Sequence, residues 1–324
     1  MTPPTRASHL RHHRAPKAAM APPVQSDRIL FAVALRLTSV ALFALMNTCI
    51  KLAEAGGAHL AEILFWRQCG AALLVTVVVG AGPGFATLPT RRFGAHLARA
   101  TVGLISMAFT FYTLTVLPLA EATTIGFSMP IFATVLGALV LKEPTGWRRW
   151  AAVAVGFTGV VIVAQPGGHE IPLHGALSGL LAAVLTAVVT ILLRTIGRTE
   201  KPLTTVFWFS TLSLVPLGIA YAIWAQPHTP WLWLVLVTCG LFGGAAQVAM
   251  TSSLSFGPVS AVVPMDYTSL LWATLLGWLV FDHLPDQATW VGAPVIVAAG
   301  LYIVWREHVR RREETRQTMA QGIG

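Results

Sequence analysis

The chain has 324 residues, of which 55% are hydrophobic and only 11% are charged. A water-soluble domain has about 25% charged residues, so this composition excludes an ordinary soluble protein and predicts that lipid surrounds most of the chain. The net charge of +9 is spread over tails and alternate loops, which excludes a compact basic domain for binding nucleic acid.

The chain begins with a segment rich in Pro, Arg and His, residues 1–28, which we interpret as a disordered basic cytoplasmic tail. The apolar run that follows is too long for the hydrophobic core of a signal peptide. Successive apolar stretches of about 20 residues then fit helices that cross a bilayer, and they lack the period-two alternation of barrel strands. The predicted spans are 29–53, 59–80, 95–117, 122–141, 149–165, 174–193, 203–224, 231–254, 260–281 and 288–305.

Lysine and arginine are distributed very unevenly between the two sides of the predicted membrane. All of the 22 except Arg36, Lys51 and Arg67 lie in the tails, in the segments after the second, fourth and sixth spans, or in the first residues of the spans that follow those segments. Loops with an excess of Lys and Arg stay in the cytoplasm. Both termini are therefore predicted to be cytoplasmic, in an inner membrane of bacterial type. The opposite loops, which contain no Lys or Arg, are 54–58, 118–121, 166–173, 225–230 and 282–287.

The second half of the chain repeats part of the first. Residues 133–165 align without gaps with residues 273–305, and chance similarity between apolar helices is the alternative. A repeat of five helices is odd, so its copies must insert in opposite directions, as in transporters with inverted repeats. The predicted fold is an all-α membrane protein of ten transmembrane helices in two inverted five-helix repeats, 29–165 and 174–305, followed by a cytoplasmic basic tail, 306–324.

Two segments identify a family resemblance. They are FALMNTCIKLAE in the first span and PLAEATTIGFSMPIFATVLGALVLKEPTGWRRWAAVAVGFTGVVI across the fourth and fifth spans. The chain resembles the drug/metabolite transporter superfamily, specifically its EamA-type members, over nearly its whole length. The resemblance implies a central cavity and substrates among amino acids, nucleotide-linked compounds, vitamins and drugs. The first half is similar to uptake members for riboflavin and for S-adenosylmethionine, while the second half departs, with Asp282 and His283 where the first has Glu143.

Ionisable side chains inside the predicted spans are the first candidates for the substrate site, because each costs about 2.5–3.5 kcal/mol at the centre of a membrane helix without a partner. Arg67 either lines a cavity as an anion-binding or gating charge, or pairs with Glu62, or extends its side chain to the membrane interface. Asn47 and Lys51 lie four residues apart and share one helix face. Lys51 either contributes to the site or extends to the outer interface.

The ninth and fourth spans supply further candidates. Asp266, with Tyr267 beside it, either binds a cationic substrate group or a proton, or pairs with another helix. Pro264 and Pro130 are predicted helix breaks, since proline removes a backbone hydrogen bond, and such breaks expose backbone groups to substrate in transporters. Ser128 would line the break in the fourth span.

The third and eighth spans complete the candidate set. Tyr112 adjoins a stripe of hydroxyl side chains in the third span, and Gln247 shares a face with Gly240 and Gly244 in the eighth. The two glycines form a GxxxG sequence, for which helix packing is the favoured interpretation. We expect Gln247 itself to face the cavity.

Several activities lack the sequence motifs that they require. The chain has no GxxxxGK[ST] phosphate loop and no HExxH motif, and its three cysteines have no metal-like spacing. We therefore expect no enzyme activity, no cofactor and no metal. The predicted function is secondary transport of a small organic metabolite by alternating access, and the alternative is a flippase for a lipid or a lipid-linked carrier. The expected partners are a small-molecule substrate and the bilayer, not nucleic acid, while protons and a second copy of the chain are left open.

Overall fold

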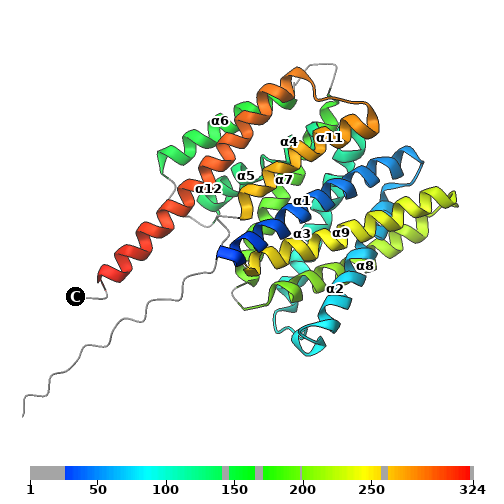
Figure 1. Cartoon of the computed structure of the whole chain (residues 1–324), viewed down its shortest axis with the longest axis horizontal. Coiled ribbons are helices and arrows are strands. Elements are labelled where there is room, and N and C mark those ends of the chain that lie inside the picture. The colour runs from blue at the N-terminus through cyan, green and yellow to red at the C-terminus, as the bar shows by residue number, and fades with distance from the viewer. Residues whose placement is uncertain (1–25, 141–145, 165–170, 198, 257–261, 322–324) are drawn as a thin grey trace, which may run out of the picture.

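The computed structural model describes residues 26–140, 146–164, 171–197, 199–256 and 262–321, and every regular element within them is a helix. Figure 1 shows the helices as one tilted bundle. The elements are α1 (Ser26–Ala55), α2 (Leu60–Ala81), η1 (Phe85–Thr87), α3 (Phe93–Val116), α4 (Leu119–Gly126), α5 (Met129–Leu139), α6 (Trp147–Ala164), α7 (Leu173–Ile196), α8 (Pro202–Trp224), α9 (Pro230–Phe256), η2 (Val263–Thr268), α11 (Ser269–Phe281) and α12 (Gln287–Gln321).

Nine segments of the described chain are long and apolar enough to cross a membrane, with α4 and α5 counted as one segment. The tenth crossing is η2 together with α11, which is divided into a 3₁₀ turn and a short helix. The all-helical fold of ten spans predicted from the sequence is confirmed. Lipid offers no hydrogen bonds, so the helices satisfy their backbone groups internally.

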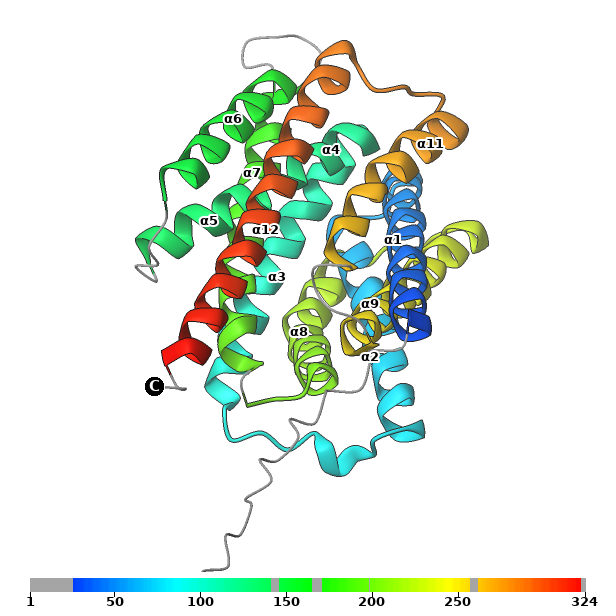
Figure 2. The same ribbon diagram turned by 60° about the vertical axis from the view of Figure 1, so that its left-hand side comes forward.

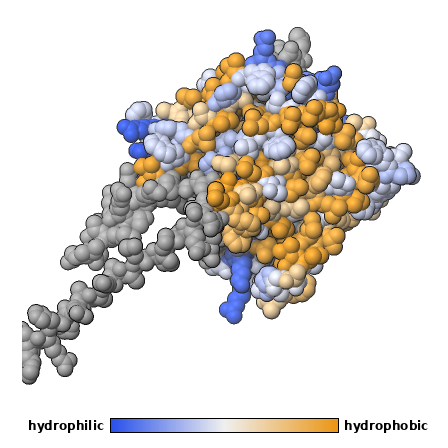
Figure 3. Space-filling view, viewed as in Figure 1, coloured by the Kyte–Doolittle hydropathy of each residue, from blue (hydrophilic) through white to orange (hydrophobic). Residues whose placement is uncertain are grey.

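The outer surface of the bundle is apolar. Leu73, Val215 and Ile219 are each more than half exposed, at 58%, 67% and 62%. In the space-filling view, hydrophobic residues cover most of the visible face and the most hydrophilic residues lie toward its ends (Figure 3). Such a surface would be unstable in water and matches the hydrocarbon core of a bilayer.

The helices repeat in the order that the sequence alignment predicts. α5 begins at Met129 and α11 at Ser269, while α6 begins at Trp147 and α12 at Gln287, so both pairs keep the same offset of 140 residues. The contacts between the halves follow the same repeat. α1 packs along α9, and their equivalents α7 and α3 pack along each other. α2 packs against its own equivalent α8, and α6 packs against its own equivalent α12. Because each half has five crossings, equivalent helices run in opposite directions.

Small residues allow close helix contacts within and between the halves. A Cβ on Gly70 of α2 would lie 2.1 Å from the backbone of Gly240 in α9, and one on Gly244 would lie 2.7 Å from Gly70. The packing role predicted for the GxxxG glycines is therefore confirmed. α6 and α12 cross where a Cβ on Gly159 or Gly292 would approach the other residue's carbonyl oxygen within 3.0 Å.

Both views place the start of α1 and the end of α12 at the same end of the molecule (Figures 1 and 2). Of the predicted tail 1–28, residues 1–25 lie outside the described residues, as does Glu143. Within the predicted basic tail 306–324, α12 continues as one helix to Gln321. Its Arg, Glu and Gln residues favour helix, and extending an existing helix needs no new nucleus.

Candidate functional site

A cavity of about 360 Å³ lies between the two halves of the bundle. The first half contributes residues of α1, α3, α4 and α5, and the second half contributes residues of α7, α9, η2 and α11. The two divided spans, α4–α5 and η2–α11, place Phe127, Met129, Asp266 and Ser269 on its wall. Ligand pockets in proteins are commonly about 300–1,000 Å³, so the cavity has the size of a small-metabolite site.

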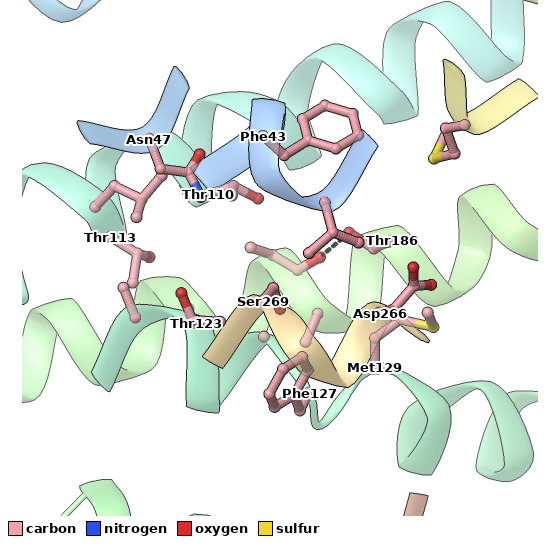
Figure 4. A pocket seen from close by; sticks show the side chains of 18 of the residues that line it. Phe43, Asn47, Thr110, Thr113, Thr123, Phe127, Met129, Thr186, Asp266 and Ser269 are labelled. Carbon is pink, nitrogen blue, oxygen red and sulfur yellow. Dashed lines mark hydrogen bonds between the residues drawn. The ribbon is translucent and has the colours of Figure 1, made fainter. Parts of the chain in front are cut away.

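Aromatic rings and hydroxyl groups share the cavity wall. In Figure 4 the ring of Phe43 lies above the cavity and that of Phe127 below it, with Thr110, Thr113 and Thr123 toward one side. Aromatic faces bind flat rings by stacking, and nearby hydroxyls fix the orientation of a ligand through hydrogen bonds.

The hydroxyl groups of α3 and α7 present mainly acceptor positions to the cavity. Thr110 donates its proton to the Ser106 carbonyl at 2.9 Å, and Thr186 donates to the Ala182 carbonyl at 2.8 Å. A hydroxyl that donates to its own helix keeps free lone pairs. In the described structure, the Asn47 side chain on α1 has no hydrogen bond, so its amide can both donate to a ligand and accept from it.

The charges on the cavity wall neutralise each other. Nε and Nη2 of Arg36 on α1 donate to Oδ1 and Oδ2 of Asp266 on η2, both at 2.5 Å. The Arg36 side chain is 9% exposed and that of Asp266 is 39% exposed. This fork-shaped pair joins the first half to the second. Among the described residues, no other charged side chain lines the cavity.

The structure brings only two of the eight predicted substrate-site residues to this cavity, Asn47 and Asp266. Tyr112 is 38% exposed and lies beside His174, because one residue along a helix turns the side chain by about 100° from Thr113. Gln247 is half-buried and lies outside the set of lining residues.

Lys51 and Arg67 have local partners away from the cavity. Lys51 donates to the carbonyls of Leu114 and Leu117 at 3.1 Å and 2.8 Å, and so satisfies acceptors that the end of α3 leaves unpaired. Arg67 contacts the side-chain oxygen of Gln68. The alternative that Arg67 pairs with Glu62 is wrong, because the Glu62 carboxylate accepts from other groups.

The carboxylates near the ends of α2 and α4 are both buried. Glu62 accepts from His59 N at 2.7 Å and from Gln226 N at 3.1 Å, and it pairs with His228 Nε2 at 2.8 Å. Glu121 is 1% exposed and accepts from the backbone N–H of Asp286, in the α11–α12 loop, at 3.2 Å. Its helix begins inside the bundle, which the sequence pattern does not reveal.

The remaining candidates lie beside the divided spans. Ser128 is fully buried and donates to the Ile125 carbonyl at 2.7 Å, outside the cavity lining. The ring of Tyr267 packs against that of Phe127 at 5.0 Å and therefore supports the cavity wall from behind. Pro130 lies in the first turn of α5, and Pro264 lies in the first turn of η2.

Sequence reasoning missed several residues of the cavity wall. Arg36 was noted only as a basic residue inside a span, although that position was itself the signal for a buried partner. Phe43 and Phe127 had no signal, because aromatic residues are common throughout the spans. Among the described residues, no group of three or more His, Cys, Asp or Glu could hold a metal ion.

Comparisons with known proteins give one family. The EamA-like transporter family matches twice, over residues 30–165 and 173–306. A riboflavin transporter of Rhizobium johnstonii is 31% identical over 256 residues, covering 78% of this chain and 83% of that protein. A riboflavin transporter of Vibrio cholerae is 28% identical over 70% of this chain and 77% of that protein.

Two other similarities complete the comparison. An S-adenosylmethionine uptake transporter of Rickettsia prowazekii is 28% identical over 77% of this chain and 84% of that protein. A solved crystal structure superposes with a TM-score of 0.57 at 18% identity, covering 84% of this chain and 96% of that chain. At this identity, the superposition shows a shared fold alone.

Proposed function

Because the chain belongs to the EamA-like transporter family, we propose that it is a secondary transporter that carries a small, ring-bearing, uncharged metabolite by alternating access. The substrate binds in the cavity between the halves and is released on the other side when the halves rearrange. The two inverted halves support this mechanism, since they supply two arrangements of similar energy around one site.

The single observation that carries the substrate class is the composition of the cavity wall. Phe43 and Phe127 offer ring faces, the threonine hydroxyls offer acceptors, and Asn47 offers an amide. The charges of Arg36 and Asp266 are satisfied by each other. A ligand with a net charge would have to break that pair or enter without a counter-ion, which is costly in a site of low dielectric.

The names of the relatives supply two substrates that test this reasoning. Riboflavin is a flat ring system with a polyhydroxyl chain and no charge at neutral pH, and it matches the wall chemistry. S-adenosylmethionine has an adenine ring but also carries a sulfonium, an ammonium and a carboxylate. We therefore infer that this chain favours a flavin-like or nucleoside-like neutral substrate over a charged one.

Transport can be tested by counterflow into liposomes that contain the purified protein. Vesicles loaded with unlabelled riboflavin should accumulate external labelled riboflavin, and unlabelled S-adenosylmethionine should not replace it inside. Uptake should saturate with concentration and should need no ATP. Equal counterflow of both compounds would contradict the inferred preference, and the absence of counterflow across a panel of neutral ring-bearing metabolites would contradict the proposal.

A pair of phenylalanine variants shows whether the cavity is the site. Phe43→Ala removes a stacking surface, and loss of stacking costs about 1–3 kcal/mol, or roughly tenfold to hundredfold in affinity. Phe157→Ala is the matched control, because Phe157 is 43% exposed on α6 and does not line the cavity. Equal effects of the two variants on half-saturation would place the site elsewhere.

We also propose that both termini face the cytoplasm of a bacterial-type inner membrane. The loops predicted to be outside contain no Lys or Arg, whereas those at the end with the termini contain many. Figures 1 and 2 place the start of α1 and the end of α12 together, as this topology requires.

A further inference from the structure

A second polar cluster lies outside the cavity, where α2 packs against α8 and α9 and where α3 packs against α8. Arg67 on α2 contacts Gln68, and the Gln68 amide donates to the Phe209 carbonyl of α8 at 3.4 Å. The guanidinium of Arg99 on α3 lies over the Phe209 ring, 4.3 Å from its centroid. We call Arg67, Gln68, Arg99 and Phe209 the arginine cluster.

Arg99 extends toward the middle of its span and not toward the nearby end of α3. The helix begins at Phe93, so a long basic side chain could extend back to the polar interface. Instead, its Nη1 lies only 2.0 Å from where a Cβ on Gly103 would be, one turn farther along the helix. A larger residue at position 103 would require the guanidinium to move from this place.

The arginine cluster contains hydrogen-bond donors without acceptors. Nε of Arg67 and both Nε and Nη1 of Arg99 are buried and have no partner in the described structure. Arg67 is 6% exposed. Buried donors normally find acceptors, so three unpaired guanidinium nitrogens on either side of the Gln68–Phe209 contact indicate a missing acceptor.

The cluster also lacks a counter-ion. The two guanidinium groups lie within electrostatic range of each other. The ion pairs between described residues, Arg36 with Asp266 and His228 with Glu62, include neither of them.

The interactions that are present do not offset this charge. A charged arginine is costly at the centre of a membrane helix. The contact of Arg99 with the Phe209 ring offsets part of that cost for Arg99 and none of it for Arg67. Water can accept from the free N–H groups but supplies no negative charge. An anion meets both requirements at once, because it accepts from several donors and places negative charge beside the two cations.

We propose that the arginine cluster binds a small inorganic anion within the membrane-spanning bundle. This site is separate from the cavity, since no described residue of α2 or α8 lines the cavity. The bound anion links α2 to α3 and α8 and stabilises the fold without being transported substrate. Guanidinium donors suit both halides and small oxyanions, so the test must compare these two kinds of anion.

The test is thermal unfolding of the full-length protein in detergent at constant ionic strength. Gluconate, a bulky anion, is replaced stepwise by chloride and, in a separate series, by phosphate. Binding to the folded state raises the unfolding midpoint with the logarithm of anion concentration above Kd. We expect the midpoint of the wild type to rise in this way, starting near the Kd. The control variant Arg148→Gln, at an exposed arginine, should show the same rise. The midpoint of Arg99→Gln should not rise.

A second variant and a direct measurement keep the proposal testable if Arg99→Gln does not fold. The double variant Arg67→Met with Arg99→Leu removes both charges and should be stable in gluconate, with a midpoint independent of chloride and phosphate. Equilibrium dialysis with radioactive chloride or phosphate should give about one bound anion per wild-type chain and none for the double variant. Identical titrations for all variants, or no bound anion in either dialysis, would overturn the proposal.

Discussion

The ion pair between Arg36 and Asp266 predicts that removing either charge destabilises the fold, but by unequal amounts, because the two side chains differ in exposure. The two side chains share one pair of hydrogen bonds, but Arg36 is 9% exposed and Asp266 is 39% exposed. Asp266→Asn leaves a buried cation without a partner, which costs about 3–5 kcal/mol. Arg36→Gln leaves a carboxylate that the cavity can hydrate, so its cost is closer to that of an exposed pair, about 1 kcal/mol.

The double variant separates the loss of the pair from the cost of an orphaned charge. Arg36→Gln with Asp266→Asn has neither charge, so it should be more stable than Asp266→Asn alone, by about 2 kcal/mol. In one detergent, the unfolding midpoint should be highest for the wild type, lower and similar for Arg36→Gln and the double variant, and lowest for Asp266→Asn. Equal destabilisation by the two single variants, or additive losses in the double variant, would refute the reasoning.

Three further predictions concern packing, helix ends and topology. Gly70→Ala should destabilise the fold by several kcal/mol, because the new Cβ would lie 2.1 Å from the backbone of Gly240. In the control variant Gly126→Ala the new Cβ meets nothing within 4 Å, so the unfolding midpoint should be nearly unchanged. Lys51→Gln should cost about 1–3 kcal/mol, since it removes a charged donor from the end of α3; an unchanged midpoint in thermal unfolding would contradict this. In intact cells, a single cysteine in the α8–α9 loop should react with a membrane-impermeant maleimide, while one in the α2–α3 loop should react only after lysis; the reverse pattern would overturn the proposed orientation.

The fold was predictable from the sequence because its main signals are local. Apolar stretches of about 20 residues define the crossings, and the absence of Lys and Arg from alternate loops defines their direction. The repeat was visible because residues 133–165 and 273–305 align without gaps. The structure adds that the fourth and ninth spans are divided, each at the cavity.

The cavity wall was only partly predictable, because it depends on how helices are rotated and which distant residues they meet. Arg36 and Asp266 are 230 residues apart in the sequence, and nothing local marks them as partners. Arg67 shows the opposite error: a charge inside a predicted span was a candidate for the cavity wall, but it lies with Arg99 outside the cavity. The local sequence shows that a charged residue lies inside a membrane span. Which residue it pairs with depends on how the helices pack in the bundle.

The crossing of α6 and α12 has a mechanical consequence. At that point, Gly159 and Gly292 bring two bare stretches of backbone together, with no side chain of either residue between them. The absent side chains let the two backbones approach closely, and Ile296 of α12 and Val163 of α6 fill the space beside the two glycines. A larger residue at either position would therefore push α6 and α12 apart and widen the seam between the halves.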